Sequence, residues 1–497
     1  MIPIPLVQPK EAHAAVDAEA KFDYEFDYQI TRELGRGAYA KVYEAFETKT
    51  NKKVAIKKFI KALVHAHLAQ YCIREIEILT SGNHQNIVKM HHVTRSKNSV
   101  YLIMEYTPSD LRKLIHSTSY LEPEEVKKLM YEMLVALNYL HSAKIVHRDI
   151  KPGNILTTAE KNIKLCDFGL ARSIRGLKIN SYDFDDIYRR EYAISSDKYL
   201  SLAATDIGES MEEITEDLDE HVKVNTICSI SDHFSKDTRG PHTMKPIIKM
   251  KPGTSIGVQE EIKAPVKLGG RISVSMRRAE FIKSLKPDPN MERELTSHVA
   301  SRWYRAPEVI LLEKVYFTSV DIWGAGCVFA ELLQTILANC PDVKARHAFF
   351  PGTCCFPLSP QLKDTAKEEV KQELGDKDQI VAIVDILGSP SESDISFVTD
   401  YGAKQYIQGL PQQKKKSLAS IFPASDKDAL ALLGRMLEFS PFMRITAKEA
   451  LRHPYFKSLR NKDSETERGP MAIESEVPEA TAISKLMLIC DQAKYTP

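Results

Sequence analysis

The chain has 497 residues, with 68 basic and 67 acidic side chains and a formal net charge of +1. This balance gives no overall field that would attract nucleic acid or an anionic membrane, so we expect neither as a partner. Hydrophobic residues make up 43% and charged residues 27%, which is typical of a globular protein of several domains. The eight cysteines show no CxxC and no metal-ligand spacing, so we expect reduced thiols and an intracellular protein, cytoplasmic or nuclear.

The N-terminal residues 1–25 are polar and contain prolines, and they lack the basic n-region of a secretory signal. We expect a flexible extension there. The longest apolar stretch, residues 322–338, is interrupted by Glu331 and Gln334, so the sequence predicts no membrane-spanning helix.

A small β-rich region is expected to come first in the folded chain. Short alternating runs between Tyr28 and Lys58 are broken by Gly35 and Gly37, which predicts three antiparallel strands. Residues 62–80 then switch to helical spacing. A long amphipathic helix is predicted over Glu124–Ser142, and most of the remaining chain also has helical periodicity.

Residues 173–294 differ from the rest of the chain. The range 183–220 contains thirteen acidic and three basic residues, whereas 236–286 contains twelve basic and four acidic residues, so the two parts could neutralise each other. Apolar residues are scattered there without a sustained period. We expect an insertion that is largely disordered, or alternatively functional.

A glycine-rich loop follows the first predicted strand: Leu34-Gly35-Arg36-Gly37-Ala38-Tyr39-Ala40-Lys41-Val42. Glycine allows the backbone to approach phosphate oxygens. The strand that follows argues against a dinucleotide-binding fold, which needs a helix at this point. The next strand ends in Lys57, which can contact phosphates. Taken alone, the loop also fits an ordinary hairpin and the lysine an ordinary surface position.

The most specific signal is the run His147-Arg148-Asp149-Ile150-Lys151-Pro152-Gly153-Asn154, followed by Asp167-Phe168-Gly169. A carboxylate, a lysine two residues later and an amide five residues later can surround one phosphoryl group. The second carboxylate, Asp167, can hold Mg²⁺. The motifs Ala306-Pro307-Glu308 and Asp321-Ile322-Trp323-Gly324 follow in the expected order.

On these motifs the chain resembles eukaryotic protein kinases over roughly residues 28–456, apart from the insertion. The resemblance implies an α+β bilobal kinase fold, with a small β-rich N-lobe, a large α-rich C-lobe, and ATP and Mg²⁺ in the cleft. The expected parts are a flexible extension (1–25), the N-lobe (26–106), the C-lobe (107–172 and 295–460), the insertion in the activation segment (173–294), and a C-terminal extension (461–497) with a helix packing on the N-lobe.

The resemblance also implies roles for single residues. Asp149 would be the catalytic base, Lys151 would neutralise the γ-phosphate as in the serine/threonine class, and Asn154 and Asp167 would bind Mg²⁺. The nucleotide would be held by the glycine-rich loop from Leu34 to Val42, by Lys57 paired with Glu75, by the gatekeeper Met104, by the hinge from Glu105 to Thr107, and by Asp110 near the ribose. Glu308 would pair with Arg444.

Within the kinases the chain is similar to mitogen-activated protein kinases (MAP kinases). The evidence is the activation lip Thr296-Ser297-His298-Val299-Ala300-Ser301-Arg302-Trp303-Tyr304-Arg305, the segments Asp385–Ser391 and Leu410–Phe422, and the ending His453-Pro454-Tyr455-Phe456. That family carries Thr-x-Tyr, whereas this chain has Thr-Ser-His, which resembles an atypical protozoan branch. The alternatives are a cyclin-dependent-kinase-like enzyme, although Tyr71–Leu79 lacks the cyclin-binding signature, and a catalytically weak scaffold with the same fold.

The resemblance places an activating phosphate on Thr296, surrounded by Arg74, Arg148 and Arg172, whose guanidinium groups can satisfy its oxygens. Arg302 and Arg305 are expected in the substrate pocket, and in relatives they contact a second phosphate, on tyrosine. This chain has His298 in place of that tyrosine, so the second phosphate is not expected. His298 could equally be an ordinary surface residue. We expect a monomer that phosphorylates Ser/Thr-Pro sites in proteins and is activated by an upstream kinase or by itself.

Two smaller features remain. Cys166 resembles a thiol that some relatives expose to the ATP pocket, although such a residue is more often a small buried hydrophobe. Near the C-terminus, Ile483, Leu486, Ile489 and Ala493 have helical spacing and predict the helix that packs on the N-lobe.

Overall fold

The computed structural model describes residues 27–37, 40–174, 178–179, 182–183, 301–313, 317–355, 378–471 and 477–493. The chain divides into two compact units, Met1–Arg175 with Met291–Pro497, and Gly176–Asn290. In the second unit the described residues are strands β11 (Lys178–Ile179) and β12 (Tyr182–Asp183), which pair antiparallel. The expected flexible extension, most of the expected insertion and Thr296 lie outside the described residues.

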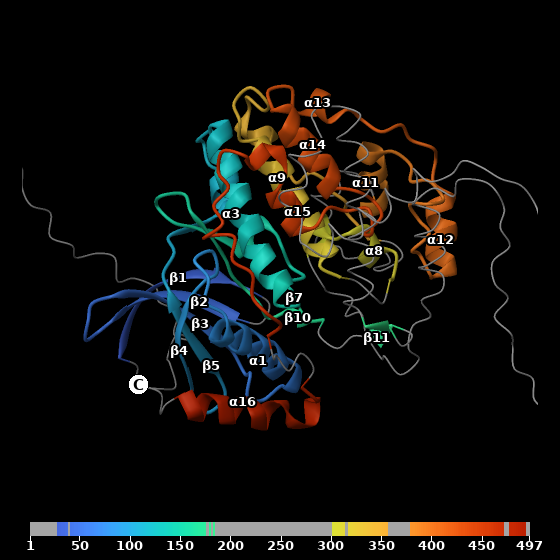
Figure 1. The fold of residues 1–497 in the computed structure, drawn as a ribbon. Coiled ribbons are helices and arrows are strands. Elements are labelled where there is room, and N and C mark those ends of the chain that lie inside the picture. The colour runs from blue at the N-terminus through green and yellow to red at the C-terminus, as the bar shows by residue number, and fades with distance from the viewer. Residues whose placement is uncertain are drawn as a thin grey trace, which may run out of the picture. The chain divides into compact units, whose positions relative to one another are not determined.

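The N-lobe is built on a five-stranded antiparallel sheet in the order β1-β2-β3-β5-β4 (Figure 1). Its strands are β1 (Tyr28–Arg36), β2 (Ala40–Glu47), β3 (Lys53–Phe59), β4 (Met90–Arg95) and β5 (Val100–Glu105). The three predicted strands are therefore confirmed. One apolar cluster on the sheet consists of the buried residues Ala45, Val54, Ile56, Tyr101 and Ile103.

Helix α1 (Ala66–Ser81) follows β3 in the chain. It begins four residues later than the prediction from residue 62, because Lys61 has a positive φ of 57° and the Val64 N–H donates to the Lys61 carbonyl in a turn. Its apolar side, with Ile73 and Ile76 at its centre, is buried. The polar residues Arg74, Glu75 and Glu77 on the same helix make contacts described below.

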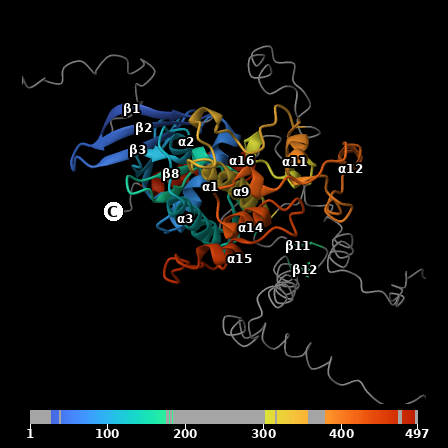
Figure 2. The same ribbon diagram turned by 90° about the horizontal axis from the view of Figure 1, so that it is seen from above.

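The C-lobe is mainly helical. Its elements are β6 (Ser109–Asp110), α2 (Leu111–Ile115), α3 (Pro123–Ser142), β7 (Ile145–Val146), η2 (Pro152–Asn154), β8 (Ile155–Thr157), β9 (Ile163–Leu165), β10 (Arg172–Ser173), η3 (Arg302–Tyr304), α8 (Pro307–Ile310), α9 (Ser319–Leu333), η4 (Val343–Ala345), α11 (Gln379–Leu387), α12 (Tyr401–Gln408), α13 (Leu418–Ile421), α14 (Lys427–Met436), α15 (Ala447–Leu451) and η6 (Pro454–Phe456). The elements labelled η are 3₁₀ helices. Figure 2 shows α12 at the edge of this lobe, away from the N-lobe sheet. The expected bilobal α+β fold is confirmed.

Helices α3 and α9 pack against each other in the middle of the C-lobe. Helix α3 begins one residue before the predicted range because Glu122 and Glu125 form a capping box around its first turn. Helix α9 is buried on all sides from Val320 to Leu333, which explains why its sequence is the most apolar stretch of the chain. Within the part of the chain that the structure describes, no helix is long and apolar enough to span a membrane.

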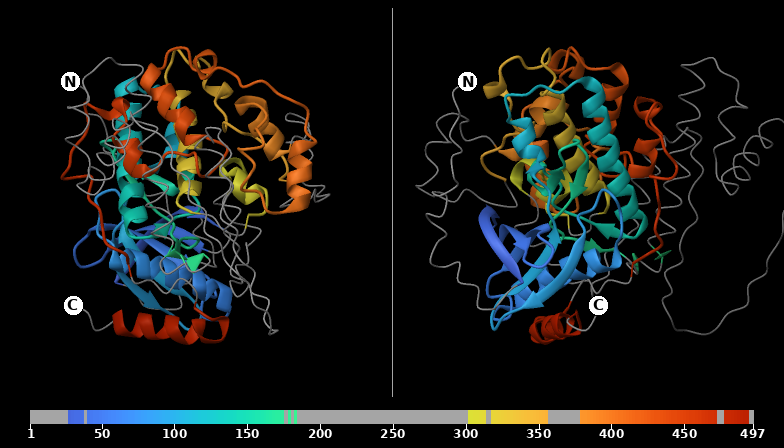
Figure 3. Two further views of the ribbon diagram at one scale, coloured as in Figure 1. Left: turned by 45° about the vertical axis from the view of Figure 1, so that its right-hand side comes forward. Right: turned by 90° about the vertical axis from the view of Figure 1, so that its left-hand side faces the viewer.

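Helix α16 (Glu479–Ala493) lies against α1 and β4 of the N-lobe (Figure 3). Lys485 pairs with Glu77 of α1 at 2.6 Å, and Arg95 of β4 pairs with Asp491 at 2.9 Å. The buried residues are Ala482, Leu486 and Cys490, four apart, so only Leu486 of the predicted apolar set is fully buried. The small side chains of Ala482 and Cys490 allow α16 to lie close to α1, a signal that a search for large apolar residues misses.

A buried ion pair joins two distant parts of the C-lobe. Arg444 donates to both carboxylate oxygens of Glu308, at 2.7 and 3.0 Å, and both side chains are at most 1% exposed. The same guanidinium donates to the Ser319 carbonyl at 2.7 Å and lies 5.1 Å from the Trp323 ring. The pair fixes α8 and the start of α9 to the segment before α15.

We predict that Arg444→Met lowers the free energy of unfolding by about 3–5 kcal/mol, because the Glu308 carboxylate is left buried without its cation. Urea denaturation monitored by tryptophan fluorescence measures the change. Lys49→Met is the control, since the Lys49–Asp27 pair is 74% and 64% exposed and its loss should cost less than about 1 kcal/mol. Equal losses in the two variants would contradict the prediction.

Candidate active site

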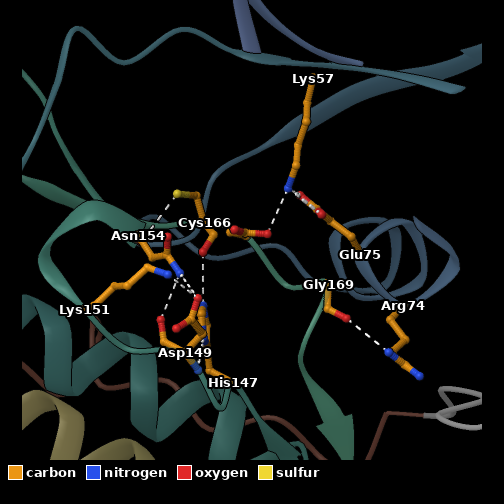
Figure 4. A network of polar contacts seen from close by, with 10 residues as sticks. Lys57, Arg74, Glu75, His147, Asp149, Lys151, Asn154, Cys166 and Gly169 are labelled. Carbon is orange, nitrogen blue, oxygen red and sulfur yellow. Dashed lines mark hydrogen bonds and ion pairs between the residues drawn. The ribbon is translucent and has the colours of Figure 1, made fainter. Parts of the chain in front are cut away.

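One lysine joins the two lobes. The Lys57 ammonium on β3 lies 2.7 and 2.6 Å from the two carboxylate oxygens of Glu75 on α1, and 2.9 Å from Oδ1 of Asp167 in the C-lobe (Figure 4). The Lys57 and Glu75 side chains are 10% and 1% exposed, whereas Asp167 is 47% exposed. The structure therefore brings together three residues that lie far apart in the sequence.

The charges of these three groups shift one another's pKa. Burial alone would lower the pKa of Lys57, but the Asp167 and Glu75 carboxylates raise it above its ordinary value. Burial acts to raise the pKa of Asp167, yet the neighbouring Lys57 ammonium lowers it. Lys57 is thus held as a cation and Asp167 as an anion at neutral pH, which suits contacts with phosphate and with a metal ion, respectively.

The segment after β7 forms a second network around Asp149. Lys151 Nζ lies 2.6 Å from Asp149 Oδ2, and Asn154 Nδ2 donates to the same oxygen at 2.8 Å and to the Asp149 carbonyl at 2.9 Å. Asp149 is 5% exposed. The carboxylate, ammonium and amide predicted from the motif therefore do converge on one point.

Asp321 in α9 holds this segment in place. Its carboxylate accepts the backbone N–H groups of His147 at 2.8 Å and Arg148 at 2.7 Å, and it lies 2.9 Å from Nε2 of His141. Arg148 has a positive φ of 67°, which a non-glycine residue adopts only when its surroundings impose it. Gly324 lets α9 approach, since a Cβ there would lie 2.9 Å from the Ile150 carbonyl oxygen. The sequence motif contained Asp321, but nothing local revealed this partner.

The residues present fit a magnesium ion. The side-chain nitrogen of Asn154 is committed to Asp149, so its amide oxygen is the atom that can coordinate a cation. The Asp167 carboxylate is half-exposed, and the β8–β9 hairpin places both residues: Asn154 precedes β8, and the Cys166 N–H donates to the Asn154 carbonyl at 3.0 Å. Among the described residues no cluster of three or more His, Cys, Asp or Glu could form a closed metal site. The Asp167 carboxylate and the Asn154 amide oxygen suit Mg²⁺, which binds one or two carboxylates together with phosphates.

The glycine-rich loop joins β1 to β2 next to Lys57, which pairs with Val42 across the sheet. Gly35, Arg36 and Gly37 are exposed, and the Gly37 N–H donates to the Ala40 carbonyl at 2.8 Å. Leu34, Lys41 and Val42 are half-buried, while Ala38 and Tyr39 lie outside the described residues.

The hinge candidates lie at the end of β5. Met104 is buried, and Glu105 and Thr107 are half-buried. The Glu105 carboxylate accepts the Lys89 N–H at 2.7 Å and pairs with Lys164 at 3.0 Å. Asp110 caps α2 by accepting the Lys113 N–H at 2.9 Å, so its carboxylate has a local structural role whether or not it also contacts a ribose.

Two of the three candidate phosphate-binding arginines contact the chain after Asp167, and the third lies in that chain. Arg74 of α1 donates to the Gly169 carbonyl at 3.2 Å, and Arg148 donates to the next carbonyl, of Leu170, at 2.5 Å. Arg172 follows two residues after Leu170 in β10, where it lies opposite Val146 of the antiparallel strand β7. Residues from both lobes thus meet here, although Thr296 itself lies outside the described residues.

Arg302 and Arg305 lie in a different place, beside residues 352–355. Arg302 donates to the Thr353 carbonyl, and Arg305 is buried and hydrogen-bonds Cys355.

Cys166 is half-buried and donates to the Asn154 carbonyl at 3.4 Å, and burial raises the pKa of its thiol. Cys166 is therefore held as a neutral thiol.

Comparisons with known proteins show the family to which the chain belongs. Residues 28–207 and 281–456 match the family model for the protein kinase domain, more than half of the chain. Mitogen-activated protein kinase 7 of Arabidopsis thaliana is 27% identical over 443 residues, which cover 88% of this chain and 81% of the relative. Mitogen-activated protein kinase homolog NTF3 of Nicotiana tabacum is 28% identical over 446 residues, which cover 89% of this chain and 81% of the relative. The chain therefore belongs to the protein kinase family, as a serine/threonine kinase that is similar to the mitogen-activated branch.

Proposed function

We propose that the protein is an ATP- and Mg²⁺-dependent kinase of the MAP kinase type, which transfers the γ-phosphate of ATP to Ser/Thr-Pro sites of protein substrates. The observation that carries this proposal is the network in which Lys151 and Asn154 both contact Asp149 Oδ2. A cation and an amide at one carboxylate oxygen orient the other oxygen, Oδ1, which can then accept the proton of a substrate hydroxyl.

The proposed roles follow from the geometry. Lys57, held by Glu75, would bind the α- and β-phosphates, and Lys151 would turn from Asp149 toward the γ-phosphate. Asn154 and Asp167 would hold Mg²⁺, which supplies neutralisation of phosphate charge when bound. Asp149 would align the hydroxyl and take its proton. Catalysis of this kind depends on positioning and electrostatics, which matches the rigid support that Asp321 provides.

We predict that Asp149→Asn lowers kcat by roughly 10²–10⁴-fold while KM for ATP stays within about twofold, because the change removes the proton acceptor and leaves the phosphate contacts in place. The measurement is steady-state phosphorylation of a basic protein substrate with ATP and Mg²⁺, with thermal unfolding as the check on folding. Near-normal turnover in the variant would contradict the assignment of Asp149 as the proton acceptor. An inactive unmodified chain would instead support the scaffold alternative.

The proposed preference for proline rests on the lip Arg302-Trp303-Tyr304-Arg305. In kinases with this sequence the amide of the residue after the acceptor finds no partner, and proline has no such amide. We predict that Ser-Pro peptides are phosphorylated at least about fivefold faster than matched Ser-Ala peptides, corresponding to about 1 kcal/mol. A peptide array that varies this one position measures the ratio, and equal rates would refute the preference.

The proposed activation requires one phosphate, on Thr296. The support is that Arg74 and Arg148 donate to the Gly169 and Leu170 carbonyls, close in the chain to Arg172, together with His298, which cannot become phosphotyrosine. Three guanidinium groups close together repel one another, and a phosphate with about −1.5 to −2 charges would bind them by charge-assisted hydrogen bonds. An upstream threonine kinase or autophosphorylation would supply it.

We predict that Thr296→Ala lowers kcat/KM at least about tenfold, since the arginines lose their anion, whereas His298→Ala stays within about threefold of the unmodified chain. Both variants should be assayed beside a mass-spectrometric map of phosphosites. Full activity of Thr296→Ala, or an activating phosphate found only within residues 173–294, would place the switch elsewhere.

A further inference from the structure

The second half of the lip, from Ser301 to Arg305, lies between the Asp149 carboxylate and a loop of the C-lobe. The Ser301 N–H donates to Asp149 Oδ1 at 3.3 Å. The next two side chains point to the loop: Arg302 donates to the Thr353 carbonyl, and the Trp303 indole N–H donates to the Gly352 carbonyl at 3.0 Å. Residues 301–303 are therefore positioned from one side by the active site and from the other by two consecutive carbonyls.

Those carbonyls are fixed by Gln379, the first residue of α11. Its side-chain oxygen accepts the Gly352 N–H at 3.0 Å, its side-chain nitrogen donates to the Phe350 carbonyl at 3.0 Å, and its backbone N–H donates to the Cys354 carbonyl at 3.0 Å. Gln379 is fully buried. A Cβ at Gly352 would lie 2.6 Å from the Gln379 Cα, so this close approach needs glycine.

Asp378, the preceding residue, ties three elements together. Its Oδ1 accepts the Ile380 N–H at 2.9 Å and so caps α11, and its Oδ2 lies 3.6 Å from the Cys354 thiol. The Tyr406 hydroxyl of α12 also hydrogen-bonds this carboxylate. Asp378 is 8% exposed. One buried carboxylate thus links the 352–355 loop, the start of α11 and α12.

We propose that Asp378 is a positioning residue for the protein substrate: together with Gln379 it holds the 352–355 loop, whose carbonyls hold Arg302 and Trp303 beside Asp149. We name residues 352–355 with Asp378 and Gln379 the substrate clasp. The contacts of the clasp use carbonyls, an amide, a thiol and a carboxylate, so they need no phosphate on the lip. This inference rests on the proposed function, in which the segment next to Asp149 receives the substrate.

The isosteric variant Asp378→Asn tests the clasp contacts of Asp378 separately from its role as the N-cap of α11. The remaining carbonyl oxygen can still accept the Ile380 N–H, whereas the Cys354 thiol and the Tyr406 hydroxyl lose their charged acceptor and face a weaker, donating NH₂ group. The loop should be held less firmly to Asp378 and α12, while Gln379 still joins it to the start of α11 and α11 keeps its cap. Asp426→Asn is the matched control, because Asp426 caps α14 through the Asp428 N–H at 2.7 Å and has no part in the clasp.

The test measures KM for a Ser-Pro peptide, KM for ATP and the melting temperature in the unmodified chain and both variants. We expect Asp378→Asn to raise KM for the peptide about fivefold to tenfold, with KM for ATP within about twofold and the melting temperature close to that of Asp426→Asn. Tyr406→Phe, which removes one contact, should raise the peptide KM by about threefold. An unchanged peptide KM in Asp378→Asn, or equal increases for peptide and ATP, would overturn the proposal.

Hydrogen exchange makes the test independent of activity. In Asp378→Asn the amides of residues 301–306 should exchange at least about tenfold faster than in the unmodified chain and in Asp426→Asn. An inactive unmodified chain would contradict the proposed function but leave this prediction standing. Unchanged exchange over 301–306 would overturn the clasp even in an active kinase.

Discussion

The segment that carries Asp149, the proposed catalytic base, depends on one buried carboxylate. Asp321 is 1% exposed and accepts hydrogen bonds from two consecutive backbone N–H groups, at His147 and Arg148. Hydrogen bonds to a charged group are each worth about 1.5–3 kcal/mol, enough to offset the cost of about 1–3 kcal/mol for the positive φ of Arg148. That backbone turn aims Asp149, Lys151 and Asn154 at one point. The backbone before Asp149 is thus held by α9, a helix that lies more than 170 residues later in the chain.

Helix α1 performs the corresponding task for the N-lobe. Within four residues it presents Arg74 to the Gly169 carbonyl, Glu75 to Lys57, and Glu77 to Lys485 of α16. Lys57, the chain after Asp167 and the C-terminal helix are therefore all in contact with one rigid element. A small rotation of α1 would change all three contacts together, because a helix transmits movement along its length and its packed neighbours deform little.

The parts of this structure that sequence reasoning could predict are those whose signals are local. Lys151 and Asn154 follow Asp149 by two and five residues, and a short segment can only place them around one point. The first three strands of the N-lobe, β1 to β3, follow from alternation and glycine positions. The partners of these residues could not be predicted, because the hydrogen bonds from His147 to Asp321 and from Trp303 to Gly352 depend on how distant segments pack. The buried side of α16 was missed for the same reason: Ala482 and Cys490 are buried through close contact with α1 and not through their own size.

The position of α16 has a consequence for the synthesis of the protein. Gln70 of α1 donates to the Val477 carbonyl at 2.6 Å, a contact between residues 407 positions apart. Ribosomes add roughly 5–20 residues per second, so the outer side of α1 emerges about 20–80 s before the helix that covers it. During that interval the side of α1 that packs on α16, with Cys72 near Cys490, has no cover from that helix. The nascent N-lobe therefore exposes a hydrophobic surface that chaperones can bind, and its final packing must wait until α16 has been translated.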